Sequence, residues 1–511
     1  MAERTPADPV ATRLFITCFT ALVATAFCFV LRAFVIDDWG REFSLSATQK
    51  GELLGVGLWP FAISIALLSL VIDRIGYRIV LWFAVAGHLG GTLITLFADG
   101  YWSLYIGTFV LALANGAVEA AVNPLIATAY RTDKTKWINM LHAGWPGGLV
   151  LGGLLAIAVG ADVDWRWKIG LVILPVLAYS TLLLRQSLPV HERVAAGVSY
   201  RAMLAEAGYL SALVVSALVV IEIGRVFALP IALQIVLIAV MTAAYAFYAR
   251  APGRPLFILL LILMVPLATT ELGTDSWITS LLEPQMVAMG LHPGWVLVYT
   301  SALMLGLRLS AGPLVHRFSP LGLLAICSAI AAVGLYGLSE ATGMGLLVAA
   351  TIYGVGKSFL WPTTLGLAAE QFPKGGAVAI NVVAGAGMLA VGIVGSVFLG
   401  AVQDTATGVA LADRDAVQGT HLHDTYFTQE RRGLFGTYLS LDEAAVAAAD
   451  ETTRREIARA VTDSKGAALR SVIVLPLIML GTYLLLMLYF RRRGGYRPEE
   501  LAGGSATETS S

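Results

Sequence analysis

Long apolar segments separated by short polar loops make up most of the chain. A helix needs about 20 apolar residues to cross the hydrocarbon core of a membrane, because lipid offers the backbone no hydrogen-bond partners. Segments of this length recur in two sets of six, at 13–36, 51–72, 79–98, 101–130, 137–160 and 168–188, and then at 255–281, 295–315, 321–339, 344–369, 377–402 and 468–490. This pattern predicts an all-α polytopic membrane protein built from two six-helix bundles.

The segment between the two sets is apolar as well, where a plain protein of two six-helix halves has a polar linker. Residues 209–223 and 231–248 predict an extra central hairpin, which brings the total to about 14 spans. Because the first of the two is short and carries Glu222 and Arg225, the alternative is an amphipathic helix at the membrane interface.

The expected organisation follows from these segments. It consists of an N-terminal bundle at 1–190, a cytoplasmic linker with the extra hairpin at 191–254, a C-terminal bundle at 255–490 with an outer-face insertion at 403–467, and a cytoplasmic tail at 491–511. The composition of the tail predicts disorder. Within the insertion, Ser440 and Glu443 form the pattern of a helix capping box.

The composition of the chain mainly excludes classes of protein and of partner. The chain is 57% hydrophobic and 13% charged, which is far too apolar for a soluble globular protein. Its 34 basic and 34 acidic residues balance, so net charge indicates neither nucleic acid nor an acidic substrate as a partner.

Basic residues gather in the loops on the side that both termini share, which predicts that this side is cytoplasmic and that the membrane is the plasma (inner) membrane. These loops are 73–78, 131–136, 185–193, 249–254 and 491–497.

An internal duplication aligns charged residues of the two halves. Residues 115–124, NGAVEAAVNP, superimpose on residues 353–362, YGVGKSFLWP, at a constant offset. Residues four apart share a helix face, so each copy carries a polar stripe beside a proline, as a binding site at a repeat interface requires. The stripes are Asn115, Glu119 and Asn123 in one copy, and Tyr353, Lys357 and Trp361 in the other.

Further charges lie in the first span of each half. These are Arg32 in one half, and Glu271 and Asp275 in the other. A charge that faces lipid costs roughly 2.5 to 3.5 kcal/mol, so we expect all of these groups to point into one central cavity. Arg32 either neutralises Glu271 or Asp275, or binds a carboxylate or phosphate of an anionic solute.

Glu119 and Lys357 are expected to form a pair across this cavity. Gating of the pair by the solute would couple proton release to a conformational change, whereas the alternative is a salt bridge that only ties the two halves together.

The loops that follow the second span of each half also repeat. SLVIDRIGYR, at 69–78, and GPLVHRFSP, at 312–320, resemble the signature of the major facilitator superfamily and its echo in the second half. The resemblance implies the major facilitator fold and a latch that closes the cytoplasmic side. The matching residues are Asp73, Arg74, Gly76 and Arg78, with Arg317 in the second copy, and Arg308 is expected to support the same end.

The fourth and fifth spans carry a second resemblance. ANGAVEAAVNPLIATAY, followed by INMLHAGWPGG at 138–148, is similar to the fucose:proton symporter family. In that family a glutamate before an Asn-Pro pair takes part in proton coupling, which implies this role for Glu119. The family has an acid in its first span, where this chain has Arg32.

These features predict a secondary active transporter that carries a small polar solute, a sugar or sugar acid, together with protons by alternating access. One alternative is an exporter of the same fold for drugs or metabolites, since fourteen-span members of the superfamily include exporters. Another is a transporter-like membrane sensor. The chain lacks a phosphate loop and a cluster of acids and histidines, so we expect no enzyme activity, cofactor or metal site.

The predicted partners are the solute, protons and the lipid bilayer, without nucleic acid or an obligate protein partner. The residues predicted to couple protons are Glu119 and Lys357, and those predicted to bind the solute are Arg32, Asn115, Asn123, Glu271, Asp275, Tyr353 and Trp361.

Overall fold

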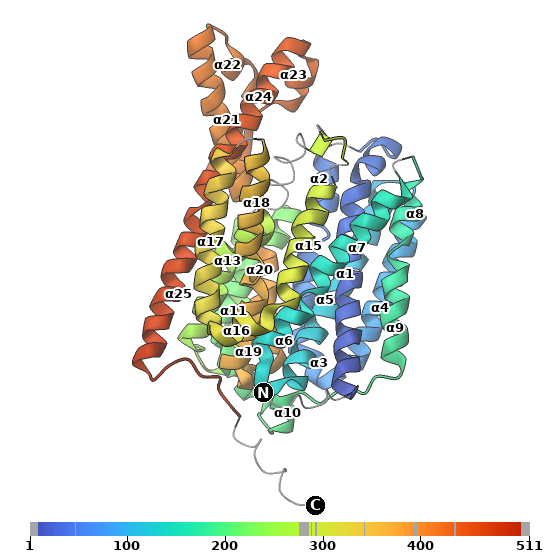
Figure 1. Ribbon diagram of the computed structural model, residues 1–511, viewed down its shortest axis with the longest axis vertical. Coiled ribbons are helices and arrows are strands. Elements are labelled where there is room, and N and C mark those ends of the chain that lie inside the picture. Colours follow the sequence, from blue (N-terminus) through green and yellow to red (C-terminus); the bar gives the residue numbers. More distant parts are fainter. Residues whose placement is uncertain are drawn as a thin grey trace, which may run out of the picture.

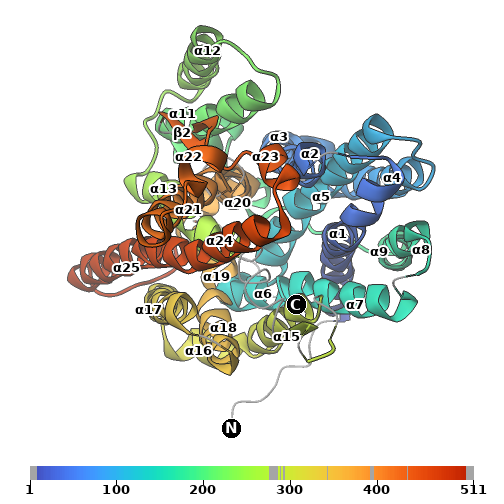
Figure 2. The ribbon, with the colours of Figure 1, turned by 90° about the horizontal axis from the view of Figure 1, so that it is seen from above.

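A computed structural model describes residues 9–501 of the chain, except 46, 161, 275–285, 288, 292–293, 342, 392–395 and 434–435. Among the described residues, 12 helices are long and apolar enough to cross a membrane, and the bent pair α15 and α16 makes a thirteenth span. The expected span at 377–402 includes residues outside the described ranges. The helices stand side by side as two groups (Figures 1 and 2), so the all-α polytopic fold is confirmed.

The N-terminal half contains six predicted spans, several of them broken into two helices. Its helices are α1 (Pro9–Glu42), α2 (Ala47–Gly55), α3 (Trp59–Ile75), α4 (Tyr77–Leu96), α5 (Tyr101–Ala129), η1 (Arg131–Asp133), α6 (Lys134–Leu141), α7 (Gly144–Val159), α8 (Trp165–Gly170) and α9 (Ile173–Leu184). The tight connection between α3 and α4 turns at Gly76, whose φ of 89° favours glycine. Helix α5 is buried on every side from Ala114 to Thr128, so it forms the centre of this half.

The C-terminal half repeats this plan. Its membrane helices are α13 (Pro255–Ala268), the π-helical turn η2 (Thr269–Gly273), α15 (Trp295–Leu309), α16 (Ala311–Arg317), α17 (Pro320–Glu340), α18 (Met344–Lys357), α19 (Leu360–Gln371), η3 (Pro373–Gly375), α20 (Gly376–Ala390), α21 (Ser396–Gln418) and α25 (Val474–Arg492). Helix α17 starts in the usual way, because Ser319 accepts the Gly322 N–H and Pro320 takes the first position.

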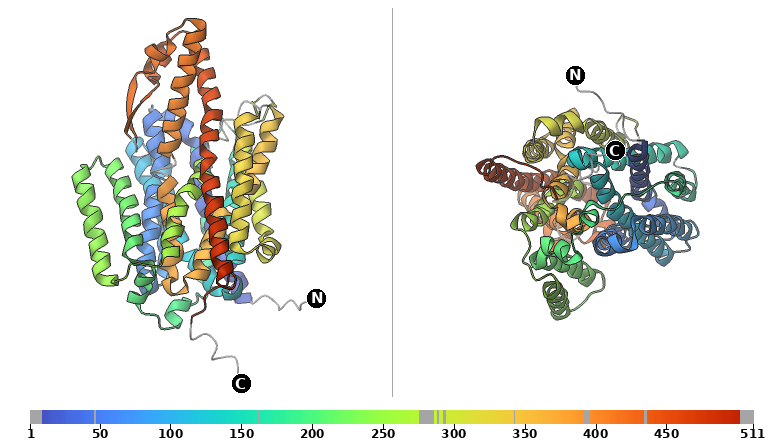
Figure 3. Two further views of the ribbon diagram at one scale, coloured as in Figure 1. Left: turned by 90° about the vertical axis from the view of Figure 1, so that its left-hand side faces the viewer. Right: turned by 90° about the horizontal axis from the view of Figure 1, so that it is seen from below.

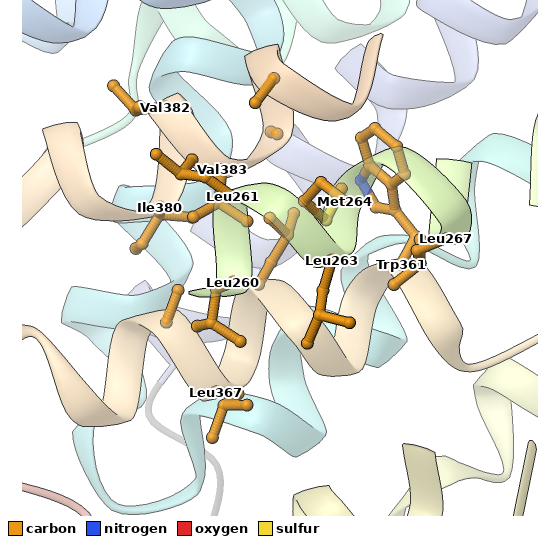
Figure 4. Close-up of a cluster of buried hydrophobic side chains, with 14 of the residues drawn as sticks. Leu260, Leu261, Leu263, Met264, Leu267, Trp361, Leu367, Ile380, Val382 and Val383 are labelled. Carbon is orange, nitrogen blue, oxygen red and sulfur yellow. The ribbon is translucent and has the colours of Figure 1, made fainter. Parts of the chain in front are cut away.

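The two halves have separate apolar cores that meet at a seam. In the C-terminal half, the side chains of Leu260 and Met264 on α13 lie among those of Trp361 on α19 and Ile380 on α20 (Figure 4). This core continues into α3 of the N-terminal half through Ile65 and its neighbours, so α3 and α20 form one packed seam between the halves.

The segment between the halves contains α10 (Glu192–Ala195) and a helical hairpin made of α11 (Tyr200–Val226) and α12 (Ile231–Ala249). Both hairpin helices stand upright beside the bundle (Figure 3), and α12 has a single buried residue, Ala249. Helix α11 bends at Gly208, where φ is 74°, and packs against α13 and α20. The extra hairpin is therefore part of the fold, and the length and hydropathy of α11 favour a span over the interfacial alternative.

A helical extension projects from the face opposite the chain ends (Figures 1 and 3). It consists of the outer part of α21, α22 (Leu422–Tyr426), the antiparallel strands β1 (Gln429–Gly433) and β2 (Gly436–Ser440), α23 (Glu443–Ala448) and α24 (Glu451–Val472). The insertion was expected to begin at residue 403, but this residue lies inside α21, which continues without a break to Gln418. The expected cap at Ser440 is wrong, since Asp442 accepts the N–H groups of Ala444 and Ala445.

The face at which α1 begins and α25 ends is called the terminal face below. The tail that follows α25 was predicted to be disordered, but its described part is tied to this face. Tyr496 donates its hydroxyl hydrogen to Glu370 at 2.6 Å, and Glu499 pairs with Arg254. The backbone N–H of Glu499 also bonds the Glu370 carbonyl at 2.8 Å. These contacts hold the stretch that contains Tyr496 and Glu499, whereas residues 502–511 of the predicted tail lie outside the described residues.

Candidate functional site

Polar groups of the two halves meet at the buried side chain of Arg308, near the end of α15. Its guanidinium donates through Nη2 to Glu271 Oε1 at 2.7 Å, through Nη1 to the carbonyl of His142 at 2.9 Å, and through Nε to the carbonyl of Ser358 at 2.6 Å. His142 belongs to the N-terminal half, and the other two acceptors belong to the C-terminal half. One side chain, 2% exposed, therefore joins both halves. Arg308 and its three contacts are called the central bridge below.

Broken helices provide the backbone groups of this site. Helix α6 ends at Leu141, just before His142, and α18 ends at Lys357, just before Ser358. The last carbonyls of a helix have no partner within the helix, and arginine is well suited to cap them. Inside a membrane such groups must be satisfied by protein, so Arg308 stabilises one break in each half.

The position of Glu271 also depends on irregular helix geometry. Pro266 lies inside α13, and the chain continues as the π-helical turn η2, which carries Glu271. Such turns are frequent at functional sites. The second oxygen of Glu271 accepts the backbone N–H of Trp361 at 2.9 Å, at the start of α19.

Glu119 lies next to this bridge on the side of the N-terminal half. Asn123 donates its Nδ2 hydrogen to Glu119 Oε2 at 2.7 Å, and Asn123 Oδ1 lies 3.0 Å from Nε2 of His142. A polar chain therefore runs from Glu119 through Asn123 to His142, whose carbonyl is bound by Arg308.

The expected pair between Glu119 and Lys357 is not formed, because no ion pair of the described residues joins these two side chains. Lys357 is buried, and its Nζ lies 5.6 Å from the ring centroid of Tyr353, one turn earlier on the same helix. An aromatic face attracts a cation and so favours this orientation. The repeat correctly placed both residues inside the protein, but it did not identify their partners.

Three of the other residues predicted to bind the solute are occupied within the protein. Asn115 Oδ1 accepts a hydrogen bond from His88 Nε2 at 2.8 Å, inside the N-terminal bundle. The Tyr353 hydroxyl donates to the carbonyl of Thr270. The indole of Trp361 packs against Gly387 within the apolar core (Figure 4), so stacking on a sugar ring is not its role in this conformation.

Of the remaining two predicted residues, one can be placed. Asp275 lies outside the described residues. Arg32 is buried on α1, near the ring of Phe29 at 5.7 Å. It does not neutralise Glu271, since that carboxylate binds Arg308.

Residues 14–396 match the sequence model of the Major Facilitator Superfamily, which amounts to most of the chain. The chain belongs to this superfamily. The resemblance found in the sequence is therefore confirmed, and the protein is a multi-pass membrane transporter and not an enzyme.

Curated relatives of this major facilitator transporter match over shorter stretches. A D-xylose transporter of Levilactobacillus brevis is 24% identical over 162 residues, which are 30% of this chain and 33% of the relative. A probable sugar efflux transporter of Helicobacter pylori is 23% identical over 161 residues, which are 31% of this chain and 41% of the relative. The matched stretches thus span less than half the length of these relatives.

Solved structures resemble the transporter over nearly its whole length. A proton:xylose symporter bound to 6-bromo-6-deoxy-D-glucose gives a TM-score of 0.60 at 14% identity, with 94% of this chain and 96% of the other covered. The human organic anion transporter gives 0.60 at 10%, with 93% and 100% covered. The fucose:proton symporter of E. coli gives 0.51 at 13%, with 91% and 99% covered. At these identities the likeness shows the fold alone.

The superfamily signature of the transporter lies at the terminal face. Asp73, at the end of α3, accepts a hydrogen bond from Arg193 Nε at 3.0 Å, and both side chains are buried. The side chain of Arg193 lies against Gly376, the first residue of α20, so this pair joins the N-terminal half to the C-terminal half. Burial lowers the pKa of the neighbouring His191 to about 4, and His191 is neutral near pH 7.

The other predicted latch residues divide into three groups. Arg74 stacks over the ring of Tyr200 at 4.1 Å, and Arg78 donates to the Gln186 carbonyl at 2.6 Å, so both tie the signature to neighbouring segments. Arg317 is exposed and lies over the ring of Phe318 at 5.7 Å. Arg308 was expected to support the same end; it binds Glu271 and the carbonyls of His142 and Ser358, and its role in the latch stays a prediction.

A second contact closes the terminal face between α6 and α19. Glu370 accepts the backbone N–H of Thr135 at 3.1 Å and also the hydroxyl of Tyr496. Nearby, Asn139 Nδ2 donates to Thr363 at 3.2 Å. Sequence reasoning missed Glu370, near the end of α19, and Arg193, in α10, because a single acid or base carries no signal of its partner in the sequence.

Proposed function

We propose that this transporter is a proton-coupled symporter of a small polar solute, a sugar or a sugar acid, which works by alternating access. The proposal places it in the plasma (inner) membrane with both termini in the cytoplasm, as the basic loops on the terminal face indicate. The observation that carries the proposal is the polar chain from Glu119 to Arg308, because it links a buried carboxylate to a side chain that is bonded to both halves.

The first step of the argument concerns the charge on Glu119. This carboxylate is 6% exposed, and its hydrogen bond comes from a neutral amide, Asn123. An ionised carboxylate in such surroundings is costly, and proton uptake removes that cost. Glu119 is thus suited to carry a proton during the conformational change.

The second step concerns the link to the conformation. In alternating access the two halves rock against each other, which separates the groups that Arg308 holds together. When Glu119 loses its proton, its negative charge competes with Glu271 for the guanidinium of Arg308. Proton release therefore weakens the bridge in the C-terminal half and favours reopening.

The third step concerns the solute. Asn381 on α20 donates to the carbonyl of Ala120, next to Glu119, at 2.8 Å, while its Oδ1 is buried without a partner among the described residues. A hydroxyl group of a solute supplies the donor that this oxygen lacks. The names of the relatives, a xylose transporter and a sugar efflux transporter, support a polyhydroxylated solute.

The test is uptake into proteoliposomes under an imposed pH gradient. Labelled sugars, uronates and small carboxylates are compared for wild type, Glu119→Gln and the control Glu222→Gln, a second buried glutamate that lies on α11 away from the bridge. We expect concentrative uptake to follow the gradient in wild type and in the control. We expect Glu119→Gln to exchange solute without accumulating it. Accumulation by Glu119→Gln equal to that of wild type would refute the coupling role.

An exporter of the same fold is the second candidate, and the match to a sugar efflux transporter favours it. The same vesicles separate the two directions. An importer accumulates solute when the proton gradient is directed inward through the face opposite the chain ends. An exporter accumulates solute only in vesicles of inverted orientation.

A further inference from the structure

Arg32 is a buried cation for which the described part of the chain provides no counter-ion. It is 5% exposed, and no carboxylate oxygen of the described residues lies within 4.0 Å of its nitrogen atoms. Its Nε donor is enclosed, and none of the described residues supplies an acceptor for it. The other two largely enclosed arginines named above have an acid each, since Arg193 binds Asp73 and Arg308 binds Glu271.

The surroundings of Arg32 leave space for its guanidinium. Helices α1 and α3 both pack on α5 (Figure 2), and Arg32 reaches from α1 to Gly57, at the break between α2 and α3. A Cβ atom at Gly57 would collide with the guanidinium, so glycine is required there for the observed position. On the other side, Phe29 approaches Arg32, and its ring lies 5.5 Å from that of Trp145.

A lone buried cation is unfavourable. Removing an ion from water costs several kcal/mol unless a partner of opposite charge compensates it, and the weak attraction of one aromatic face does not supply that compensation. A guanidinium binds a carboxylate or phosphate through two parallel hydrogen bonds, which a neutral sugar cannot provide. The chemistry of the site thus calls for an oxyanion.

We propose that Arg32 binds the oxyanion of the transported solute, so that the substrate is a small organic anion, a sugar acid or related hydroxy acid, and not a neutral sugar. This inference rests on the proposed function in that the solute is the one carried with the proton. A bound carboxylate neutralises the charge of Arg32, and a bound proton neutralises the charge of Glu119. Both buried groups are then compensated. Both can then cross with the moving halves at low electrostatic cost.

The test is ligand binding to the purified full-length protein in detergent, measured as the rise in apparent melting temperature with ligand concentration. The probes are D-glucuronate, D-gluconate, D-glucose 6-phosphate, D-glucose and D-xylose. The variants are Arg32→Gln, which removes the charge, and Arg32→Lys, which keeps the charge but loses the planar pair of donors. Arg13→Gln, an exposed arginine on the same helix, is the matched control.

We expect the acids to bind wild type and Arg13→Gln, and to bind Arg32→Gln at least about 30-fold more weakly, with Arg32→Lys in between. We also expect Arg32→Gln without ligand to be at least as stable as wild type, because the substitution removes an uncompensated charge; a purely structural arginine would give a clear loss of stability. Binding of D-glucose 6-phosphate alone among the acids would identify the oxyanion as a phosphate.

Three outcomes overturn the inference. These are equal binding of the neutral sugars and the acids, acid binding that Arg32→Gln leaves unchanged, and the absence of binding by every acid. The experiment uses no proton gradient, so its result is separate from the proton-coupling test. If Glu119→Gln fails to uncouple transport while Arg32→Gln loses acid binding, the coupling role is wrong and the anion site stands.

Discussion

The substitution Arg308→Gln provides the sharpest test of the central bridge. It removes the ion pair with Glu271 and the hydrogen bonds to the carbonyls of His142 and Ser358. Glu271 then loses its ion pair with Arg308, although the Trp361 N–H still binds Oε2. Loss of one partner of a buried ion pair costs about 3 to 5 kcal/mol, so we expect this loss in the free energy of unfolding.

A double-mutant cycle separates the ion pair from the backbone contacts. Glu271→Gln keeps an oxygen that can accept from Arg308, so we expect it to cost less than Arg308→Gln. In the double variant both charges are gone, and the combined loss should fall short of the sum of the single losses by about 1 to 3 kcal/mol. The loss that remains in the double variant measures the capping of the two helix breaks.

The assay is equilibrium unfolding in detergent by titration with a denaturing detergent, followed by tryptophan fluorescence. Arg455→Gln serves as the control, because Arg455 forms an exposed ion pair with Glu451 on the outer extension, where a loss of only about 0 to 1 kcal/mol is expected. A loss below about 1 kcal/mol for Arg308→Gln, or single losses that add up in the double variant, would refute the bridge as a stabilising contact.

Three other predictions concern separate sites. Gly57→Ala should displace the guanidinium of Arg32 and weaken acid binding as Arg32→Gln does, whereas unchanged binding would show that the close approach is not needed. The free energy of unfolding of wild type should fall by up to about 3 kcal/mol relative to that of His191→Asn as the pH falls from 6.5 to about 4, because the folded state holds His191 neutral and the unfolded chain takes up a proton there. Asparagine does not titrate and can still cap the helix that His191 caps, so the variant is the reference. Parallel pH curves for the two proteins would contradict this prediction. Tyr496→Phe removes the hydroxyl that binds Glu370, so hydrogen exchange in α6 should speed up by roughly 5- to 10-fold, while no change would mean that the tail does not support the closed terminal face.

Hydrophobic patterning was sufficient to predict the spans and the extra hairpin. A helix in lipid must be long, apolar and internally hydrogen-bonded, and these requirements are visible in a single sequence. The pattern was less informative where a helix passes out of the membrane. Helix α21 continues from an apolar beginning into a polar extension, and a composition change does not end a helix that carries no breaking residue.

The repeat predicted which polar residues are buried, but not which of them meet. Asn115 and Glu119 share a face of an ideal helix, yet Asn115 binds His88 within the bundle and Glu119 binds Asn123. Helix α5 is buried all round its central part, so it has no solvent side that would mark one face as the functional one. Helical spacing alone could not resolve this.

The role of Arg308 was hidden for a different reason. Its acceptors include two backbone carbonyls at helix breaks, and a backbone acceptor leaves no residue type to recognise in the sequence. The breaks themselves follow Leu141 and Lys357, in stretches rich in glycine and proline. A helix break within the membrane leaves backbone carbonyls without a partner, and a buried arginine near the break is the side chain best suited to bind them. The glycine- and proline-rich stretches could therefore have predicted this role for Arg308.

The hydrogen-bond polarity of the central chain adds a requirement to the proposed mechanism. With Glu119 ionised, Asn123 turns its amide N–H toward the carboxylate and its oxygen toward His142, whose Nε2 must then carry a hydrogen. A protonated Glu119 donates instead, so the amide of Asn123 is best satisfied by turning over, and His142 must then accept at Nε2. Protonation of Glu119 therefore changes whether the imidazole of His142 donates or accepts at Nε2, and Arg308 binds the carbonyl of this same residue. A carbonyl cannot titrate, so pH acts on this contact only through movement of His142 itself, and Asn123 is the group that transmits it.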